Sequence, residues 1–320
     1  MNLVYQHQLG KISLGIPVIA SPMNTVCEYK MAKAMNLMGG QSVVHRYMSI
    51  ENQVSIAKAY YGAFYAIGAA GDFLERATEL YNVGVSKFCV DVANGDSLHS
   101  LDAVVALTNK FPNAVIMGGN VCTVEGFKRL AYAGADLIRV GVGSGAMCKT
   151  RVVTGHGVPQ LTALLWAREA QKQLRQEGDR TDIAIISDGG IRTSGDIVKA
   201  LAVADFVMLG SLLAGTDEAP GDIIKENGEE YKLYAGMASE EGRGLNSWFD
   251  REKTSFVPEG EAVKLKYKGS VVQVLEELTG GLKVGMSYTG AYTLKEFREK
   301  ATFVKVSKAG MVEGTPHGKR

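Results

Sequence analysis

Short apolar runs alternate with longer amphipathic segments along the first two thirds of the chain. The runs are rich in Val, Ile and Ala, and they have the length of buried strands. Because each run is apolar throughout, both faces of the predicted strands should be covered. Eight runs can be counted, at residues 16–20, 42–45, 64–68, 87–91, 114–118, 136–140, 183–187 and 205–209.

The segments between these runs carry apolar residues at three- and four-residue spacing, which predicts helices. They include residues 28–37, 72–81, 101–111, 124–133, 159–176 and 194–203. Strands that alternate with helices, without hairpin turns between them, predict an α/β fold in which a parallel sheet closes into a (β/α)8 TIM barrel. An open doubly wound sheet is the alternative.

We expect a single catalytic domain over residues 1–320, because no composition break and no linker rich in Pro or Ser divides the predicted barrel. The barrel covers about residues 16–215, an active-site flap about residues 236–262, and a C-terminal segment residues 263–320. A chain of 320 residues with 46% hydrophobic and 22% charged residues can bury one large core.

The formal net charge of +1 supplies no bulk field that would attract nucleic acid or an anionic membrane. An anionic ligand must therefore be held by a local site. The chain shows no signal peptide and no run of about 18 apolar residues, so we expect a cytoplasmic protein. The four cysteines, Cys27, Cys89, Cys122 and Cys148, lack CxxC spacing, and we expect the first three to be core residues.

Cys148 lies on a glycine-rich loop, residues 141–149, that follows the sixth predicted strand. A thiol on such a loop is a candidate nucleophile, because the loop exposes backbone N–H groups while the barrel holds the sulfur in place. Reactive groups of this fold collect at the carboxyl ends of the strands. Asp91, Asn120 and Asp188 follow other strands at the same end.

Glycine turns follow strands seven and eight, at Gly189–Gly190 and at Gly210 before Ser211. Such turns expose backbone donors near helix amino termini, which is the common phosphate cradle of this fold. Glycine also simply permits tight turns, so one such loop alone would indicate little. Two of them on neighbouring strands indicate a phosphate site.

Five motifs follow one another along the chain at Ser21–Val26, Gly143–Thr150, Ile186–Ile191, Met208–Gly221 and Gly280–Gly290. In this order they resemble the IMP dehydrogenase and GMP reductase family. The resemblance extends over nearly the whole chain, as far as Phe303. It implies a purine mononucleotide substrate, a covalent thioimidate between Cys148 and purine C2, and a homotetramer.

The two branches of this family differ in what happens at C2. By resemblance, the dehydrogenase passes hydride from IMP to NAD and hydrolyses the thioimidate to XMP. The reductase instead expels ammonia from GMP and takes hydride from NADPH to give IMP.

Three features favour an NADPH-dependent GMP reductase, which is our prediction. The chain has no room for the regulatory CBS insert between His45 and Asp91. The runs Asp91–Gly95 and Thr150–Gln160 look like the reductase form. The segment Asn246–Phe249 lacks the arginine that activates the hydrolytic water in dehydrogenases.

Other features keep two alternatives open. Tyr234, the run Glu218–Gly221 and the tail Ala309–His317 look more like an NAD-dependent IMP dehydrogenase. Ala146 replaces a serine that usually touches the 5′-phosphate, and this departure favours a non-catalytic protein that binds a purine nucleotide.

The resemblance also implies roles for individual residues. Cys148 is the nucleophile, and Thr150 and Glu259 form a proton relay. Asp91, Ala93 and Asn94 lie on the dinucleotide side, and the carbonyls of Gly143, Gly145 and Cys148 would hold a monovalent cation, potassium. The nucleotide-binding residues are Asp188, Gly189, Gly190, Gly210, Ser211, Tyr234, Gly236, Met237 and Ser239.

Overall fold

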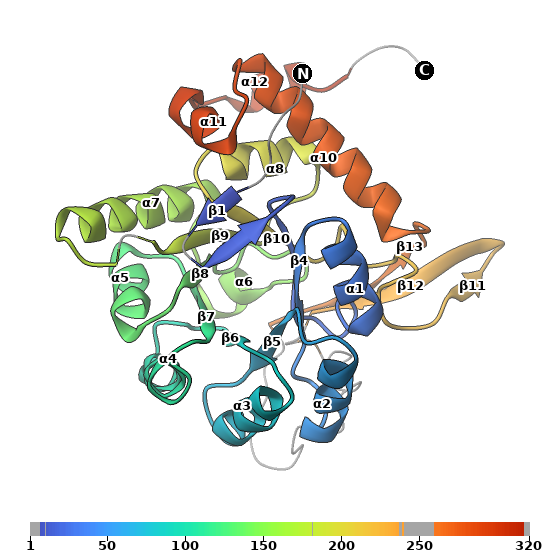
Figure 1. Cartoon of the computed structure of the whole chain (residues 1–320). Coiled ribbons are helices and arrows are strands. Elements are labelled where there is room, and N and C mark those ends of the chain that lie inside the picture. The colour runs from blue at the N-terminus through green and yellow to red at the C-terminus, as the bar shows by residue number, and fades with distance from the viewer. Residues whose placement is uncertain (1–6, 10, 181, 237–238, 240–258, 317–320) are drawn as a thin grey trace.

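A closed barrel of eight parallel strands forms the centre of the molecule and is surrounded by helices (Figure 1). This computed structural model describes residues 7–9, 11–180, 182–236, 239 and 259–316. The predicted (β/α)8 barrel is confirmed. Of the helices in these residues, none is long and apolar enough to cross a bilayer.

Each barrel strand pairs with the next one along the chain, and β10 closes the ring by pairing with β3. Every strand overlaps one of the eight predicted apolar runs, because covered parallel strands are apolar on both faces. The strands are β3 (Val18–Ala20), β4 (Gln41–Val44), β5 (Phe64–Ile67), β6 (Lys87–Val90), β7 (Val115–Val121), β8 (Leu137–Val140), β9 (Ala184–Asp188) and β10 (Phe206–Leu209).

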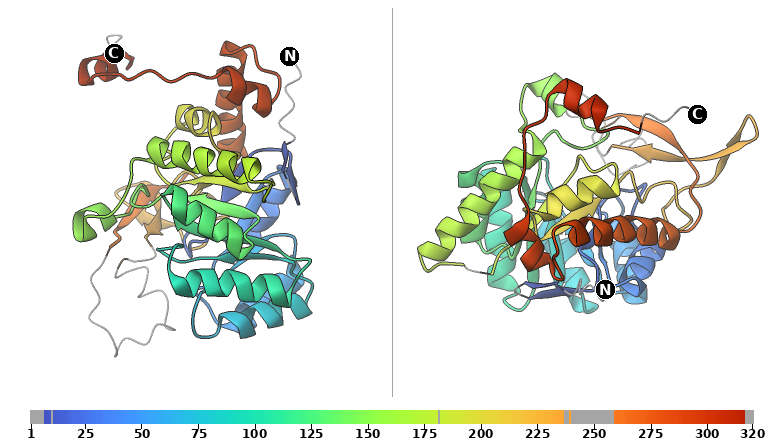
Figure 2. Two further views of the ribbon diagram at one scale, coloured as in Figure 1. Left: turned by 90° about the vertical axis from the view of Figure 1, so that its left-hand side faces the viewer. Right: turned by 90° about the horizontal axis from the view of Figure 1, so that it is seen from above.

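Helices follow the strands and cover the outside of the barrel, as Figures 1 and 2 show. Of these, α2 and the short α6 are not among the predicted helices, although the cap residue of α2, Ser49, accepts a hydrogen bond from the Asn52 N–H. The helices are α1 (Tyr29–Leu37), α2 (Ile50–Ala59), α3 (Phe73–Asn82), α4 (Leu98–Lys110), α5 (Val124–Ala133), α6 (Thr150–Thr154), α7 (Gln160–Gln176) and α8 (Ser194–Leu201).

A further helix, α10 (Val271–Tyr288), packs against α8 and α1 on the outside of the barrel. Its contact with α8 depends on two glycines that are four residues apart. A Cβ on Gly281 would lie 2.3 Å from Ser194 Oγ, and one on Gly285 would lie 2.6 Å from Val198 Cγ2. The two helices therefore approach more closely than larger residues would allow.

The amino end of the barrel is covered by a hairpin of β1 (His7–Leu9) and β2 (Ile12–Leu14), which lies in front in Figure 1. Ile12 and Leu14 are buried in the same cluster as the side chains that fill the barrel. Lys11 reaches across to the carbonyl of Ala114, which precedes β7. The open end of the barrel is therefore its carboxyl end, where the predicted site lies.

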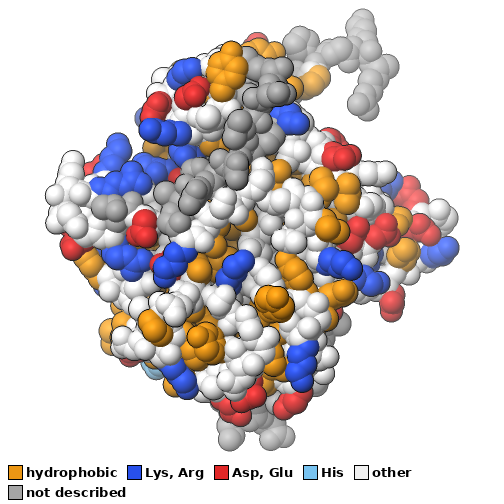
Figure 3. Space-filling model, in the orientation of Figure 1, with side chains coloured by type: hydrophobic (Ala, Val, Ile, Leu, Met, Phe, Trp, Pro, Cys, Tyr) orange, Lys and Arg blue, Asp and Glu red, His pale blue; other side chains and the backbone are white. Residues whose placement is uncertain are grey.

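A three-stranded antiparallel sheet projects from the barrel, formed by β11 (Ile224–Glu226), β12 (Glu229–Ala235) and β13 (Ala262–Lys266). This sheet was not predicted. It carries acidic and basic side chains together (Figure 3), and the exposed pair of Lys264 and Glu226 joins its two edge strands at 2.8 Å.

Two short helices, α11 (Leu294–Lys300) and α12 (Lys308–Glu313), end the described chain. Figure 2 shows α12 at the end of an extended segment that leads away from the barrel.

Candidate active site

Cys148 lies on the loop between β8 and α6, with its side chain exposed at the carboxyl end of the barrel. Its thiol donates to Thr150 Oγ1 at 3.0 Å, and the Thr150 hydroxyl donates to Glu259 Oε2 at 2.7 Å. The three residues predicted to be catalytic therefore form one row of hydrogen bonds. Such a row can carry a proton from the sulfur to a carboxylate.

Backbone contacts hold Glu259 beside this loop, although it lies 109 residues after Thr150 in the sequence. Cys148 and Gly260 form an isolated antiparallel bridge. The Lys149 N–H donates to the Glu259 carbonyl at 2.6 Å, and the Glu261 N–H donates to the Met147 carbonyl at 3.1 Å. The loop is thus paired like a short strand with the segment that enters β13.

Asp188 ends β9 and belongs to a charged network inside the barrel mouth. It accepts hydrogen bonds from Asn120 at 2.9 Å and from Arg139 at 2.9 and 3.1 Å. All three bonds from described residues end on Oδ2. Oδ1 is therefore left to accept hydrogen bonds from a ligand such as the predicted ribose.

Arg139 is a buried cation in the middle of β8, and it binds two carboxylates. It donates to Asp91 at 2.6 Å as well as to Asp188. Burial alone would disfavour the guanidinium charge, but the charges of Asp188 and Asp91 raise the pKa of Arg139 above its ordinary value. The guanidinium of Arg139 therefore stays charged inside the network.

The predicted phosphate residues lie at the carboxyl ends of β9 and β10. Gly189 and Gly190 adopt positive φ angles of 95° and 80°. A Cβ on Gly189 would lie 2.6 Å from Ser144 Oγ, so this turn packs directly against the Cys148 loop. Gly210 leaves similar space for Tyr234. A Cβ on Gly210 would lie 2.9 Å from the Tyr234 hydroxyl oxygen.

Tyr234 is buried on β12 beside this turn. Burial and the negative charge of Asp188 raise the pKa of Tyr234, so its phenol stays protonated. In this structure the hydroxyl contacts Met23 Sδ at 3.7 Å. A protonated phenol beside a glycine turn can donate to a phosphate oxygen.

Gly236 and Ser239 stand where the chain leaves β12. Gly236 donates its N–H to the Glu261 carbonyl at 2.8 Å, and the buried Ser239 hydroxyl donates to the Gly236 carbonyl at 2.7 Å. Met237 and the segment Asn246–Phe249 lie outside the described residues.

The three residues of the predicted dinucleotide side follow β6. Asp91 binds Arg139, whereas Ala93 and Asn94 are exposed. Asn94 Oδ1 accepts the Asp96 N–H at 3.1 Å, so this side chain closes its own turn.

A sequence model of the family described as IMP dehydrogenase / GMP reductase domain matches residues 4–317. The chain belongs to this family. In this structure Cys148 and Thr150, two residues apart, meet Glu259 from 109 residues further along the chain.

Curated relatives are named inosine-5′-monophosphate dehydrogenase. That of Nitrosopumilus maritimus is 43% identical over 261 residues, which cover 79% of this chain and 53% of the relative. That of Aquifex aeolicus is 46% identical over 257 residues, covering 79% and 51%. That of Staphylococcus aureus is 43% identical over 259 residues with the same coverage. The chain spans about half the length of these relatives.

These relatives contradict the prediction of a GMP reductase, and the choice of NADPH loses its support with it. The prediction depended on short matches such as Asp91–Gly95. In the structure Asp91 binds Arg139 and Asn94 closes a turn, so both residues have structural tasks that do not depend on the direction of hydride transfer.

Two residues that bind Asp188 were given no role from the sequence. Asn120 was noted only as a strand-end residue, and Arg139 was counted in an apolar strand. The sequence could have revealed the role of Arg139, because a charged side chain inside a covered strand is costly to bury unless it has partners of opposite charge.

The family's predicted cation loop has only carbonyl ligands to offer. In the part of the chain that the structure describes, no group of three His, Cys, Asp or Glu side chains could hold a metal ion. Gly143 has a φ of 74°, and the Gly145 carbonyl accepts the Cys148 N–H at 3.0 Å. Uncharged carbonyl oxygens do not suit the softer transition metals, which prefer thiolate or imidazole ligands, so the monovalent ion stays a prediction.

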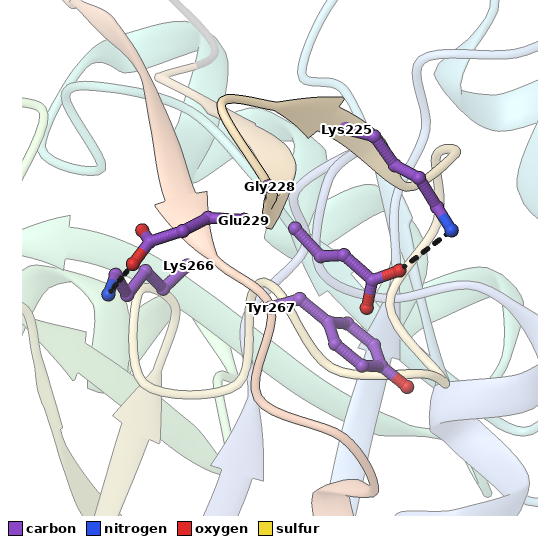
Figure 4. A pocket seen from close by; sticks show the side chains of 6 residues that line it. Lys225, Gly228, Glu229, Lys266 and Tyr267 are labelled. Carbon is purple, nitrogen blue, oxygen red and sulfur yellow. Dashed lines mark hydrogen bonds and ion pairs between the residues drawn. The ribbon is translucent and has the colours of Figure 1, made fainter.

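A pocket of about 450 Å³ lies elsewhere, at the outer end of the sheet of β11, β12 and β13 (Figure 4). Its charged side chains pair with each other, Lys225 with Glu230 at 3.2 Å and Lys266 with Glu229 at 2.8 Å. It contains none of the residues predicted for the site.

Replacing Arg139 by Met should lower the free energy of unfolding by about 3–5 kcal/mol, because two largely buried carboxylates lose the cation closest to them. Urea unfolding measures this loss. The matched control is Arg129→Met, which breaks the exposed pair with Asp96 and should cost less than about 1 kcal/mol. Equal losses in the two variants would contradict the importance of the buried network.

Proposed function

We propose that this protein is an IMP dehydrogenase, which oxidises IMP to XMP with NAD as hydride acceptor and water as the second reactant. The observation that carries the proposal is the row of Cys148, Thr150 and Glu259, joined at 3.0 and 2.7 Å. The direction of the reaction rests on the names of the relatives. A homotetramer stays a prediction.

The row of hydrogen bonds accounts for activation of the sulfur. The Cys148 thiol must lose its proton before it can add to purine C2. Its S–H points to Thr150, and the Thr150 O–H points to the Glu259 carboxylate, so the proton can pass to Glu259 in two short transfers.

The remaining steps follow from the covalent adduct. NAD would supply the hydride acceptor: after the sulfur of Cys148 adds to C2, this carbon would lose hydride, and a thioimidate on Cys148 would remain. Water then adds to C2 and the carbon–sulfur bond breaks, which releases XMP and restores Cys148. The sum is IMP, NAD and water in, and XMP, NADH and one proton out.

The surrounding residues would hold the two reactants in line. Asp188 Oδ1 would accept the ribose hydroxyls, because its other oxygen is already used. Asp91, Ala93 and Asn94 would face the dinucleotide. The phosphate and base would be bound by Gly189, Gly190, Gly210, Ser211, Tyr234, Gly236, Met237 and Ser239.

The carbonyls of Gly143, Gly145 and Cys148 would hold potassium, whose charge would order the loop that carries the nucleophile. Turnover in potassium chloride should exceed turnover in choline chloride of the same ionic strength. Equal rates in the two salts would remove the cation from the proposal.

IMP and NAD together should give NADH, detected by its near-ultraviolet absorbance, while a mixture of GMP and NADPH should give no oxidation of NADPH. Production of IMP from GMP would refute the proposed direction.

Cys148→Ala should lower the turnover rate with IMP and NAD by a factor on the order of 1000 or more, because the covalent route is lost. Activity that survives in Cys148→Ala would refute the covalent mechanism.

Thr150→Val removes the hydroxyl that joins sulfur to carboxylate and keeps the shape of the side chain. We expect kcat to fall about 100-fold or more, the contribution typical of a positioned proton-transfer group. Thr150→Ser keeps the hydroxyl and should retain most of the activity. The kcat values of the two variants are compared in steady-state assays with IMP and NAD. Equal losses in Thr150→Val and Thr150→Ser would exclude a proton relay through the Thr150 oxygen.

A further inference from the structure

The Cys148 loop and the segment that carries Glu259 are joined by very few backbone contacts. The bridge of Cys148 and Gly260 is isolated, and two backbone hydrogen bonds flank it, Lys149 to Glu259 and Glu261 to Met147. In a longer ladder many such bonds would fix the register of the two segments. Here the register depends on these few contacts and on the side chains beside them.

One ion pair lies directly beside this bridge. Lys149 Nζ contacts Glu261 Oε1 at 2.6 Å, and the two side chains are 43% and 53% exposed. Lys149 stands between Cys148 and Thr150 in the sequence, and Glu261 stands two residues after Glu259. The pair therefore connects the same two segments that the hydrogen bond from Thr150 to Glu259 connects.

The register of these segments decides whether Glu259 reaches Thr150. In an extended segment, residues i and i+2 project to the same side and residue i+1 to the other. A slip of one residue would turn the Glu259 side chain away from Thr150 and the Glu261 side chain away from Lys149. An attraction between Lys149 and Glu261 thus opposes the slip that would break the relay.

We propose that Lys149 and Glu261 are positioning residues that hold the Glu259 carboxylate on Thr150 by fixing this register. Neither side chain touches the reacting atoms. Their effect on turnover rests on the proposed function, whereas their effect on the reactivity of the Cys148 thiol does not.

Four variants separate this role from that of an ordinary surface pair. Lys149→Ala and Glu261→Ala each remove one charge. The double exchange Lys149→Glu with Glu261→Lys restores the attraction with the charges reversed. The control is Lys264→Ala on β13, which breaks the pair of Lys264 and Glu226, of similar exposure and 2.8 Å in length.

Two measurements are made on each variant. With IMP and NAD, each single variant should lower kcat about two- to fivefold with the KM for IMP unchanged, the size of effect that an exposed ion pair can supply. The alkylation profile, which is the time course of Cys148 modification by iodoacetamide at one fixed pH without any nucleotide, should be slower than in the parent protein, because the thiol has lost part of its hydrogen-bonded contact with the base. The double exchange should restore both properties, and Lys264→Ala should change neither.

Parent-like kcat and alkylation profiles in both single variants would overturn the inference. So would a double exchange that stays impaired while its circular dichroism and melting temperature match the parent. If the parent protein itself fails to oxidise IMP, the proposed function is wrong, but the alkylation profiles of the same variants still decide whether the pair positions Glu259.

Discussion

The guanidinium of Arg139 is the interaction on which the mouth of the barrel depends. It lies between the carboxylates at the ends of β6 and β9 and offsets the repulsion between these two partly buried negative charges. By occupying only one oxygen of Asp188, it also leaves the other oxygen for a ligand. One cation thus holds the barrel mouth together and prepares a binding group.

The barrel could be predicted from the sequence because its pattern is local. Each covered strand is a short apolar run, and each helix between strands shows its own period, so eight units can be recognised one at a time. The projecting sheet of β11, β12 and β13 escaped prediction for the same reason. Its strands are not continuous apolar runs, because charged side chains alternate with apolar ones, as in Ala262–Lys266.

The site was predictable only in part. Cys148 and Thr150 are two residues apart on one loop, so their proximity follows from the sequence. Glu259 joins them across 109 positions, which only a family resemblance could suggest. The partners of Arg139 lie on other strands and were not foreseen. The choice between the two branches was wrong because short matches such as Asp91–Gly95 are too few to decide it, whereas relatives aligned over 79% of the chain are named IMP dehydrogenase.

The hairpin of β1 and β2 decides which end of the barrel is free for ligands. Ile12 and Leu14 join the side chains that fill the barrel, so the amino end is filled and covered. Both reactants of the proposed reaction would therefore approach Cys148 from the carboxyl end, where its side chain is exposed. They would share one face of the molecule, so the volume that the first reactant occupies limits the space for the second.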